Sequence, residues 1–87
     1  MAVMTFGEAL KNLLDGSKVS RAGWNGKGMW LAYVPQWSGQ IGAKPIDMPA
    51  DWQGYLPFVV MYTADKRLVP WLCSQTDALA IDWGIIE

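Results

Sequence analysis

The sequence has no histidine and only one cysteine, Cys73, among its 87 residues. These absences leave no ligand set for a zinc site and remove the Ser-His and Cys-His pairs of many nucleophilic enzymes. One cysteine cannot form an internal disulfide, which suits a reducing cytoplasm. No stretch approaches 18 uncharged apolar residues, and the N-terminus has no basic segment followed by an apolar run. We therefore expect neither a membrane span nor a signal peptide.

Charged residues are also scarce, at 17% of the chain. Seven basic and eight acidic residues give a formal net charge of −1, and only Arg21 and Arg67 are arginines. A protein that binds duplex nucleic acid normally carries a basic face. We therefore expect no DNA or RNA duplex as a partner.

Apolar residues, in contrast, are abundant. They make up 52% of the chain, and six of them are tryptophans. A chain of this length forms one domain, residues 1–87, which buries only about 60–65% of its unfolded surface. The apolar fraction is high for a free monomer of this size. We infer that part of the apolar surface is buried against other copies of the chain or against a ligand.

The clearest predicted helix covers residues 6–14. Thr5 and Glu8 have the spacing of a capping box, and the apolar residues that follow recur on one helix face. Gly16 follows in the position where a left-handed residue usually ends a helix. A second, short helix is predicted at residues 75–80, after a cap at Ser74.

The remaining pattern predicts an α+β fold with a long middle loop. Residues 36–57 contain three glycines and three prolines, without a sustained period. Loops of this length in small domains usually serve a function or an interaction. Apolar and β-branched runs predict strands at residues 18–21, 29–34, 58–63, 67–69 and 81–86. The expected architecture is a small antiparallel sheet of four to five strands with two short helices.

The first candidate binding segment is the glycine-rich turn at residues 23–28. Its glycines allow backbone amides to approach a ligand and to form an anion nest. Lys27 adds a charge for phosphate, and Trp24 adds a flat surface for a base. A hairpin turn with one core tryptophan is the simpler interpretation of the composition alone. The spacing matches neither a Walker A loop nor the dinucleotide-binding GxGxxG pattern.

The second candidate segment is residues 70–77. If Ser74 caps a short helix, the amides of Gln75 and Thr76 form a ready anion site. Trp71 precedes this site, and Thr76 and Asp77 have side chains suited to ribose hydroxyls or a base edge. Taken singly, an ordinary helix cap beside a core tryptophan explains the same residues.

Together the two segments offer two stacking faces and several phosphate donors, which suits a nucleotide with two phosphates. No pair of carboxylates has the spacing of a general acid and base, so no catalytic residue is assigned. Cys73 has no histidine partner and is predicted to be a small buried hydrophobe. Trp30 and Trp83 are predicted to be strand or core residues.

An ordered series of motifs gives the chain a family resemblance. Two motifs are specific in combination: R-x-G-W-N-G-K-G at residues 21–28 and P-W-x-x-S-Q-T-D at residues 70–77. Thr5-Phe6-Gly7-Glu8-Ala9-Leu10 precedes them, Leu56-Pro57 lies between them, and Asp82-Trp83 follows. The series resembles the phage Thoeris anti-defence sponge proteins of the second type. It covers nearly the whole chain and is weakest at residues 36–55.

The resemblance implies a non-enzymatic protein without a cofactor. Such a protein would bind glycocyclic ADP-ribose signals in the cytoplasm of the infected bacterial host and keep them from the Thoeris effector. It also implies homotetramers with nucleotide pockets at subunit interfaces, and in some relatives separate pockets for cyclic oligonucleotides. Carried over by motif, the ligand-binding residues are Arg21, Trp24, Asn25, Gly26, Lys27, Gly28, Trp71, Ser74, Gln75, Thr76 and Asp77. For Arg21 the alternative is that it only braces the turn.

Two other functions remain open at this point. The chain is alternatively a hydrolase that acts on such a signal, although no acid pair, histidine or metal set supports this. It is alternatively a protein-interaction module, with Trp37 and Trp52 of the middle loop as anchors. The product formed from the signal would separate the sponge from the hydrolase.

Overall fold

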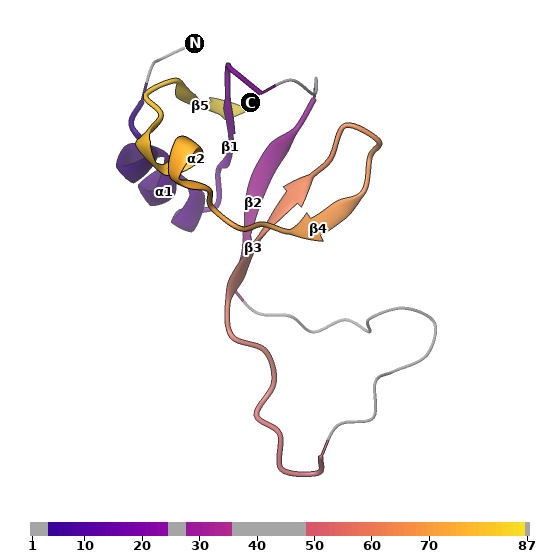
Figure 1. Ribbon diagram of the computed structural model, residues 1–87. Helices are drawn as coiled ribbons and strands as arrows, with labels where there is room; N and C mark the ends of the chain where they lie inside the picture. Colours follow the sequence, from indigo (N-terminus) through magenta and orange to yellow (C-terminus); the bar gives the residue numbers. More distant parts are fainter. Residues whose placement is uncertain (1–3, 25–27, 36–48, 87) are drawn as a thin grey trace.

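The computed structural model describes residues 4–24, 28–35 and 49–86. Five antiparallel strands form one sheet in the order β4-β3-β2-β1-β5. The strands are β1 (Lys18–Arg21), β2 (Trp30–Val34), β3 (Phe58–Tyr62), β4 (Leu68–Pro70) and β5 (Trp83–Ile86). With the helices α1 (Phe6–Leu14) and α2 (Gln75–Leu79), this confirms the predicted α+β fold. Figure 1 shows both helices on the same side of the sheet, close to β1 and β5.

Helix α1 has the predicted bounds and the predicted cap. The Glu8 backbone amide donates to Thr5 Oγ1 at 3.3 Å, while Glu8 Oε1 accepts from the Thr5 amide at 3.0 Å. These two reciprocal bonds satisfy donors that the first helical turn leaves free. Gly16, which follows the helix, has a φ of +102°, a backbone conformation that glycine adopts without a steric penalty.

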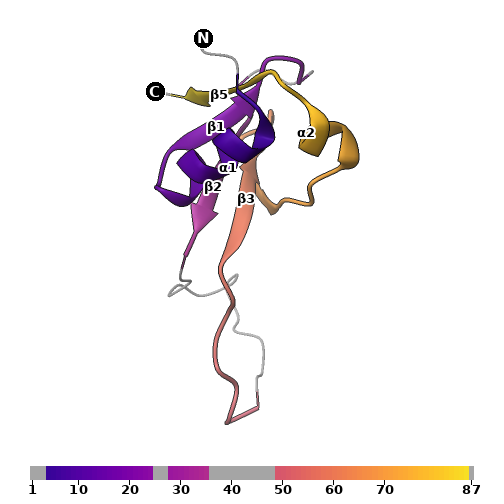
Figure 2. The same ribbon diagram turned by 90° about the vertical axis from the view of Figure 1, so that its left-hand side faces the viewer.

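The core lies between α1 and the inner part of the sheet. Its five fully buried side chains come from four elements: Ala9, Leu13, Val19, Leu31 and Trp83. Val19 and Leu31 face each other across β1 and β2, so both point toward α1. Figure 2 shows α1 in front of β1 and β2, with α2 beside it. The helix therefore covers one side of the sheet at the position where these strands are most apolar.

Some predicted boundaries differ from the structure by one or two residues. Strand β4 extends to Pro70, which was predicted to stop it. Proline is tolerated there because β4 is an edge strand, and only one of its sides pairs with β3. Helix α2 ends at Leu79, and β5 starts at Trp83. These two elements are therefore shorter than the pattern predicted.

The prediction for Cys73 is wrong. The residue is exposed rather than buried, because it lies in the segment between β4 and α2, outside the core cluster. A single apolar residue in a connecting segment has no periodic pattern that fixes which way it points. Its chemical type alone was therefore a poor guide to its burial.

Residues 49–57, the described part of the predicted middle loop, form neither helix nor strand. Figure 1 shows this segment running away from the sheet. Trp52 and Tyr55 contact each other edge to face, with ring centroids 5.3 Å apart. The rest of that loop, including Trp37, lies outside the described residues. Among the helices of the described chain, none is long and apolar enough to cross a membrane.

Candidate functional site

The two motif segments meet at an aromatic cluster on the helix side of the sheet. We define the cluster as Phe6, Trp24, Trp71 and Trp83. Trp83 has no exposed surface. Trp24 and Trp71 each lie nearly perpendicular to it, with centroid distances of 5.4 and 6.1 Å. Such edge-to-face contacts are favourable for aromatic rings. Trp24 and Trp71 are half-buried, so each also keeps some surface in solvent.

An ionic cluster links the same two segments. We define it as Arg21, Asp77 and Asp82. The Arg21 guanidinium donates from Nε to Asp82 Oδ1 at 2.8 Å and from Nη1 to Asp77 Oδ1 at 2.7 Å. Trp24 Nε1 donates to that same Asp77 oxygen at 3.2 Å. Asp77 Oδ1 therefore joins the first motif segment to the second, 53 and 56 residues further along the chain.

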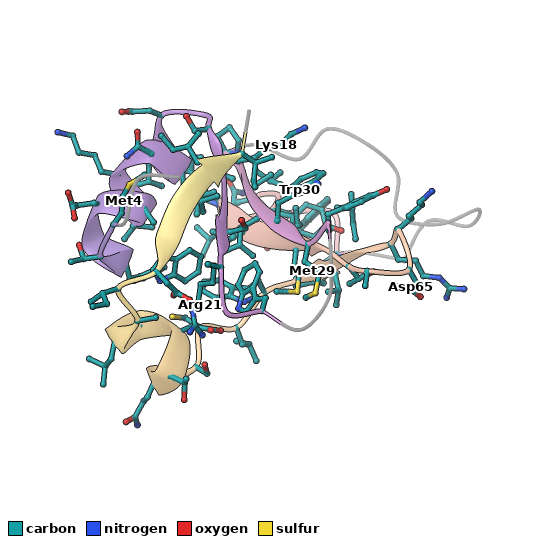
Figure 3. All side chains as sticks on the ribbon, turned by 90° about the horizontal axis from the view of Figure 1, so that it is seen from above. Met4, Lys18, Arg21, Met29, Trp30 and Asp65 are labelled. Carbon is teal, nitrogen blue, oxygen red and sulfur yellow. The ribbon has the colours of Figure 1, made fainter. Side chains whose placement is uncertain are left out.

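Asp82 holds the start of the turn through its hydrogen bonds to Arg21, Ala22 and Gly23. Besides the Arg21 bonds, its Oδ2 accepts from the Gly23 backbone amide at 2.7 Å. Its backbone carbonyl accepts from the Ala22 amide at 3.0 Å. The sequence predicted that backbone amides of this turn bind an anion. The Gly23 amide is instead hydrogen-bonded to a carboxylate of the protein. Figure 3 shows Arg21 toward α2, and Lys18 and Trp30 on the side away from both helices.

The ionic cluster keeps its carboxylates charged. Hydrogen bonding from Arg21 lowers the pKa of Asp82, and the Gly23 amide acts in the same direction. For Asp77, partial burial raises the pKa, but hydrogen bonds from Arg21 and Trp24 outweigh it and the net pKa is lowered. The pKa of Arg21 is raised, chiefly by its bond to Asp82. At neutral pH neither carboxyl holds a proton that it can donate as a general acid.

The second segment has the predicted helix cap. Ser74 accepts a hydrogen bond from the Asp77 amide at 3.1 Å and precedes α2. Ser74, Gln75 and Thr76 are exposed. The sulfur of the neighbouring Cys73 is partly buried, which raises the pKa of its thiol, and the negative charge of Asp77 raises this pKa further. The thiol is therefore protonated at neutral pH and is a weak nucleophile.

The structure brings together four of the predicted ligand-binding residues: Arg21, Trp24, Trp71 and Asp77. Arg21 and Asp77 direct polar atoms at each other, and Trp24 and Trp71 meet on Trp83. Gly28 is exposed, with a φ of +77° that favours glycine. Asn25, Gly26 and Lys27 lie outside the described residues. A ligand role for all of these residues stays a prediction.

Besides Phe6, two residues of these clusters were not predicted as site residues. Asp82 anchors the ionic cluster, and Trp83 is the centre of the aromatic cluster. Their pairing with β1 spans about sixty residues, so no local spacing predicts it. The only signal in the sequence was that Asp82-Trp83 is the last member of the motif series.

Among the described residues, no group of three or more acidic or cysteine side chains is placed to hold a metal ion.

Comparisons with known proteins agree with the motif series. A family model described as the Thoeris anti-defense 2-like domain matches residues 4–86. The protein Thoeris anti-defense 2 of Bacillus phage SP01 is 38% identical over 90 residues. That alignment covers 97% of this chain and 96% of the phage protein. The match thus spans the helices, the sheet and both motif segments, and the chain belongs to the Thoeris anti-defense 2-like family.

Proposed function

We propose that this protein is a sponge that binds cyclic ADP-ribose-type signals of the Thoeris system, with glycocyclic ADP-ribose as its ligand, and leaves them intact. Membership of the family gives it a role in phage anti-defence. The observation that carries the proposal is that Asp77 joins the two motif segments through Arg21 and Trp24. Residues that lie far apart in the chain thereby line one region.

The chemistry of that region favours binding over turnover. Asp77 and Asp82 are held ionised by Arg21, and the Cys73 thiol is protonated. Binding requires stacking and hydrogen bonding, for which Trp24, Trp71 and the start of α2 are suited. Stacking of a base on an aromatic side chain contributes about 1–3 kcal/mol. Amides near Gln75 and Thr76, together with Lys27, would meet the pyrophosphate.

The proposal includes a homotetramer in the host cytoplasm with pockets at subunit interfaces. Several large apolar side chains are exposed in the described chain, among them Leu72, Leu79 and Leu56 at 91%, 80% and 86%. Exposed apolar surface of this kind favours association with another protein surface. An interface next to α2 would enclose a nucleotide that a single copy binds on one side only.

The proposal is tested by capture and release. The protein is incubated with glycocyclic ADP-ribose made by a TIR-domain sensor, and unbound nucleotide is removed by filtration. Heating should return the intact nucleotide, which mass spectrometry identifies. Return of a linear product would make the protein a hydrolase. Absence of capture would exclude this ligand. Native mass spectrometry of the mixture reports the subunit count, and a second mixture that contains a cyclic oligonucleotide shows whether this class of signal also binds.

Two variants locate the site. Trp24→Ala and Trp71→Ala should lose capture at a temperature at which circular dichroism shows both to be folded. Both side chains pack against Trp83, so a lower unfolding temperature is expected as well. Trp30→Ala is the matched control, because Trp30 lies on the other side of the sheet. Wild-type capture by both test variants would remove these two tryptophans from the site.

A further inference from the structure

We infer that Asp82 is a positioning residue, which holds Gly23 and Trp24 next to α2 through its bonds to Arg21 and the Gly23 amide, so that Trp24 and the start of α2 form one binding surface. The inference rests on the proposed function. In that function Asp82 does not itself contact the ligand. It acts on ligand affinity by fixing the residues that do make contact.

The geometry of the Asp82 carboxylate supports this role. Oδ1 accepts from Arg21 Nε at 2.8 Å, while Oδ2 accepts from the Gly23 amide at 2.7 Å and also from Arg21 Nη2 at the longer distance of 3.5 Å. Arg21 then reaches Asp77 at 2.7 Å through Nη1. One carboxylate thus fixes the side chain that holds α2 and the backbone that leads into the turn. Charge-assisted hydrogen bonds are shorter and stronger than neutral ones, and the three shorter lengths agree with that class.

The Arg21–Asp82 pair differs from an ordinary surface ion pair. The exposed fractions of the Arg21, Asp77 and Asp82 side chains are 16%, 16% and 30%. The other Arg–Asp pair of the described chain, Arg67–Asp65, has side chains 82% and 66% exposed and a distance of 3.3 Å. Solvent screens an exposed pair strongly, whereas a partly buried pair keeps more of its attraction. Of these two groups of ion pairs, the Arg21 cluster is therefore the one suited to hold distant segments in place.

Gly23 gives a second, steric observation. A Cβ atom at this position would lie 2.9 Å from Asp82 Oδ2 and 3.3 Å from Arg21 Nη2. Gly23 is not among the described glycines with positive φ, so its backbone conformation does not itself demand glycine. The absence of a side chain is needed because the ionic cluster packs directly against it. Gly23→Ala therefore disturbs the cluster while every charge remains present.

The same contacts separate the roles of Arg21 and the ligand donors. The Gly23 amide and all three side-chain nitrogens of Arg21 already bind carboxylates, and a phosphate placed beside them would meet the negative charge of Asp82. Like charges at this separation repel. We therefore assign Arg21 to positioning, together with Asp82, and leave the phosphate to donors elsewhere in the two segments.

The test compares Asp82→Asn with Asp65→Asn, two changes that alter the net charge equally. Affinity and association rate for glycocyclic ADP-ribose are measured by calorimetry and stopped flow, at a temperature at which both variants are folded. Asp82→Asn should bind about tenfold more weakly, the effect of losing one charge-assisted hydrogen bond. The association rate should fall, because fewer molecules have the binding-competent arrangement. Asp65→Asn should bind as wild type does.

Gly23→Ala keeps the inference falsifiable if Asp82→Asn does not fold. It should weaken affinity as well, and the two changes combined should lose less than the product of the separate losses, because both act through one carboxylate. Wild-type affinity in a folded Asp82→Asn variant, or in Gly23→Ala, would overturn the inference, even if the unfolding temperature fell. Absence of capture by the wild-type protein would instead contradict the proposed function.

Discussion

Trp83 and Trp30 lie on opposite sides of the sheet and have different surroundings. Trp83, in β5, has no exposed surface and contacts Phe6, Trp24 and Trp71. Trp30, in β2, is half-buried and stacks on Tyr62 at 4.7 Å, with an interplanar angle of 11°. The helix side is thus connected through residues far apart in sequence, while the other side has a contact between adjacent strands.

The difference extends to polar groups. Trp83 Nε1 donates to the Asp77 carbonyl at 3.0 Å, and Trp24 Nε1 donates to the Asp77 side chain. On the other side, Lys18 Nζ lies 4.5 Å from the centroid of the Trp30 ring. The helix side therefore combines packing with directed hydrogen bonds, and the Trp30 side has a weaker cation–π contact. This contrast indicates that the helix side fixes the candidate site and that changes to it cost more.

The largest expected effect is on the free energy of unfolding, when Trp83 and Trp30 are each truncated to alanine and the two losses are compared. Trp83→Ala should lower the free energy of unfolding by about 3–5 kcal/mol, the usual cost of removing a large buried aromatic side chain. Trp30→Ala should cost about 1–2 kcal/mol, because only part of its surface is buried and one ring contact is lost. Urea denaturation at a fixed protein concentration measures both, since assembly contributes to apparent stability. Equal losses would contradict the contrast between the two sides.

Acid should weaken the helix side next. The folded-state pKa values of Asp77 and Asp82 are lowered, mainly by Arg21 in the case of Asp82. Groups of this kind stabilise the fold fully above the ordinary carboxyl pKa, about 3.9, and lose that contribution as the pH falls through the lowered folded values. The unfolding temperature should therefore drop below about pH 4. Two other titratable groups lie beside these carboxyls: Arg21, from β1, and the Cys73 thiol.

A double variant identifies the source of that acid sensitivity. Asp77→Asn combined with Asp82→Asn should start from a lower unfolding temperature at pH 6 and lose less on acidification. Trp30→Phe, which removes no titratable group, should keep the wild-type slope. Parallel pH profiles for the wild type and the double variant, recorded by calorimetry, would assign the acid sensitivity to carboxyls elsewhere.

The sequence predicted local elements better than it predicted the contacts between them. Helix α1 was predicted to the residue because the Thr5 and Glu8 cap and Gly16 all lie within one short segment. Strand β1 was predicted with its observed bounds, and β2, predicted from an apolar run that ends before Pro35, begins one residue later than expected. Strand β4 was displaced by one residue, because an edge strand tolerates a proline that the pattern treated as a stop.

The candidate site was predictable in part, for the same reason. The two motifs pointed to Trp24 and Trp71, and the structure brings both onto Trp83. The partner of Arg21 was not predictable, because Asp82 lies 61 residues away and is brought close by the pairing of β1 with β5. The motif left Arg21 as either a ligand residue or a brace of the turn, and its carboxylate partners became visible only with the fold.

The smallest expected effect concerns Lys18. Lys18→Met keeps an apolar stem beside Trp30 and removes the charge, so the loss should be about 0.5–1 kcal/mol, as for an exposed cation–π contact. Lys66→Met, in the exposed turn between β3 and β4, is the matched control and should change stability less. The difference should vanish in a Trp30→Leu background, because the ring that attracts the ammonium group is gone. A Lys18→Met loss that persists there, measured by urea denaturation, would show that Lys18 acts through another group.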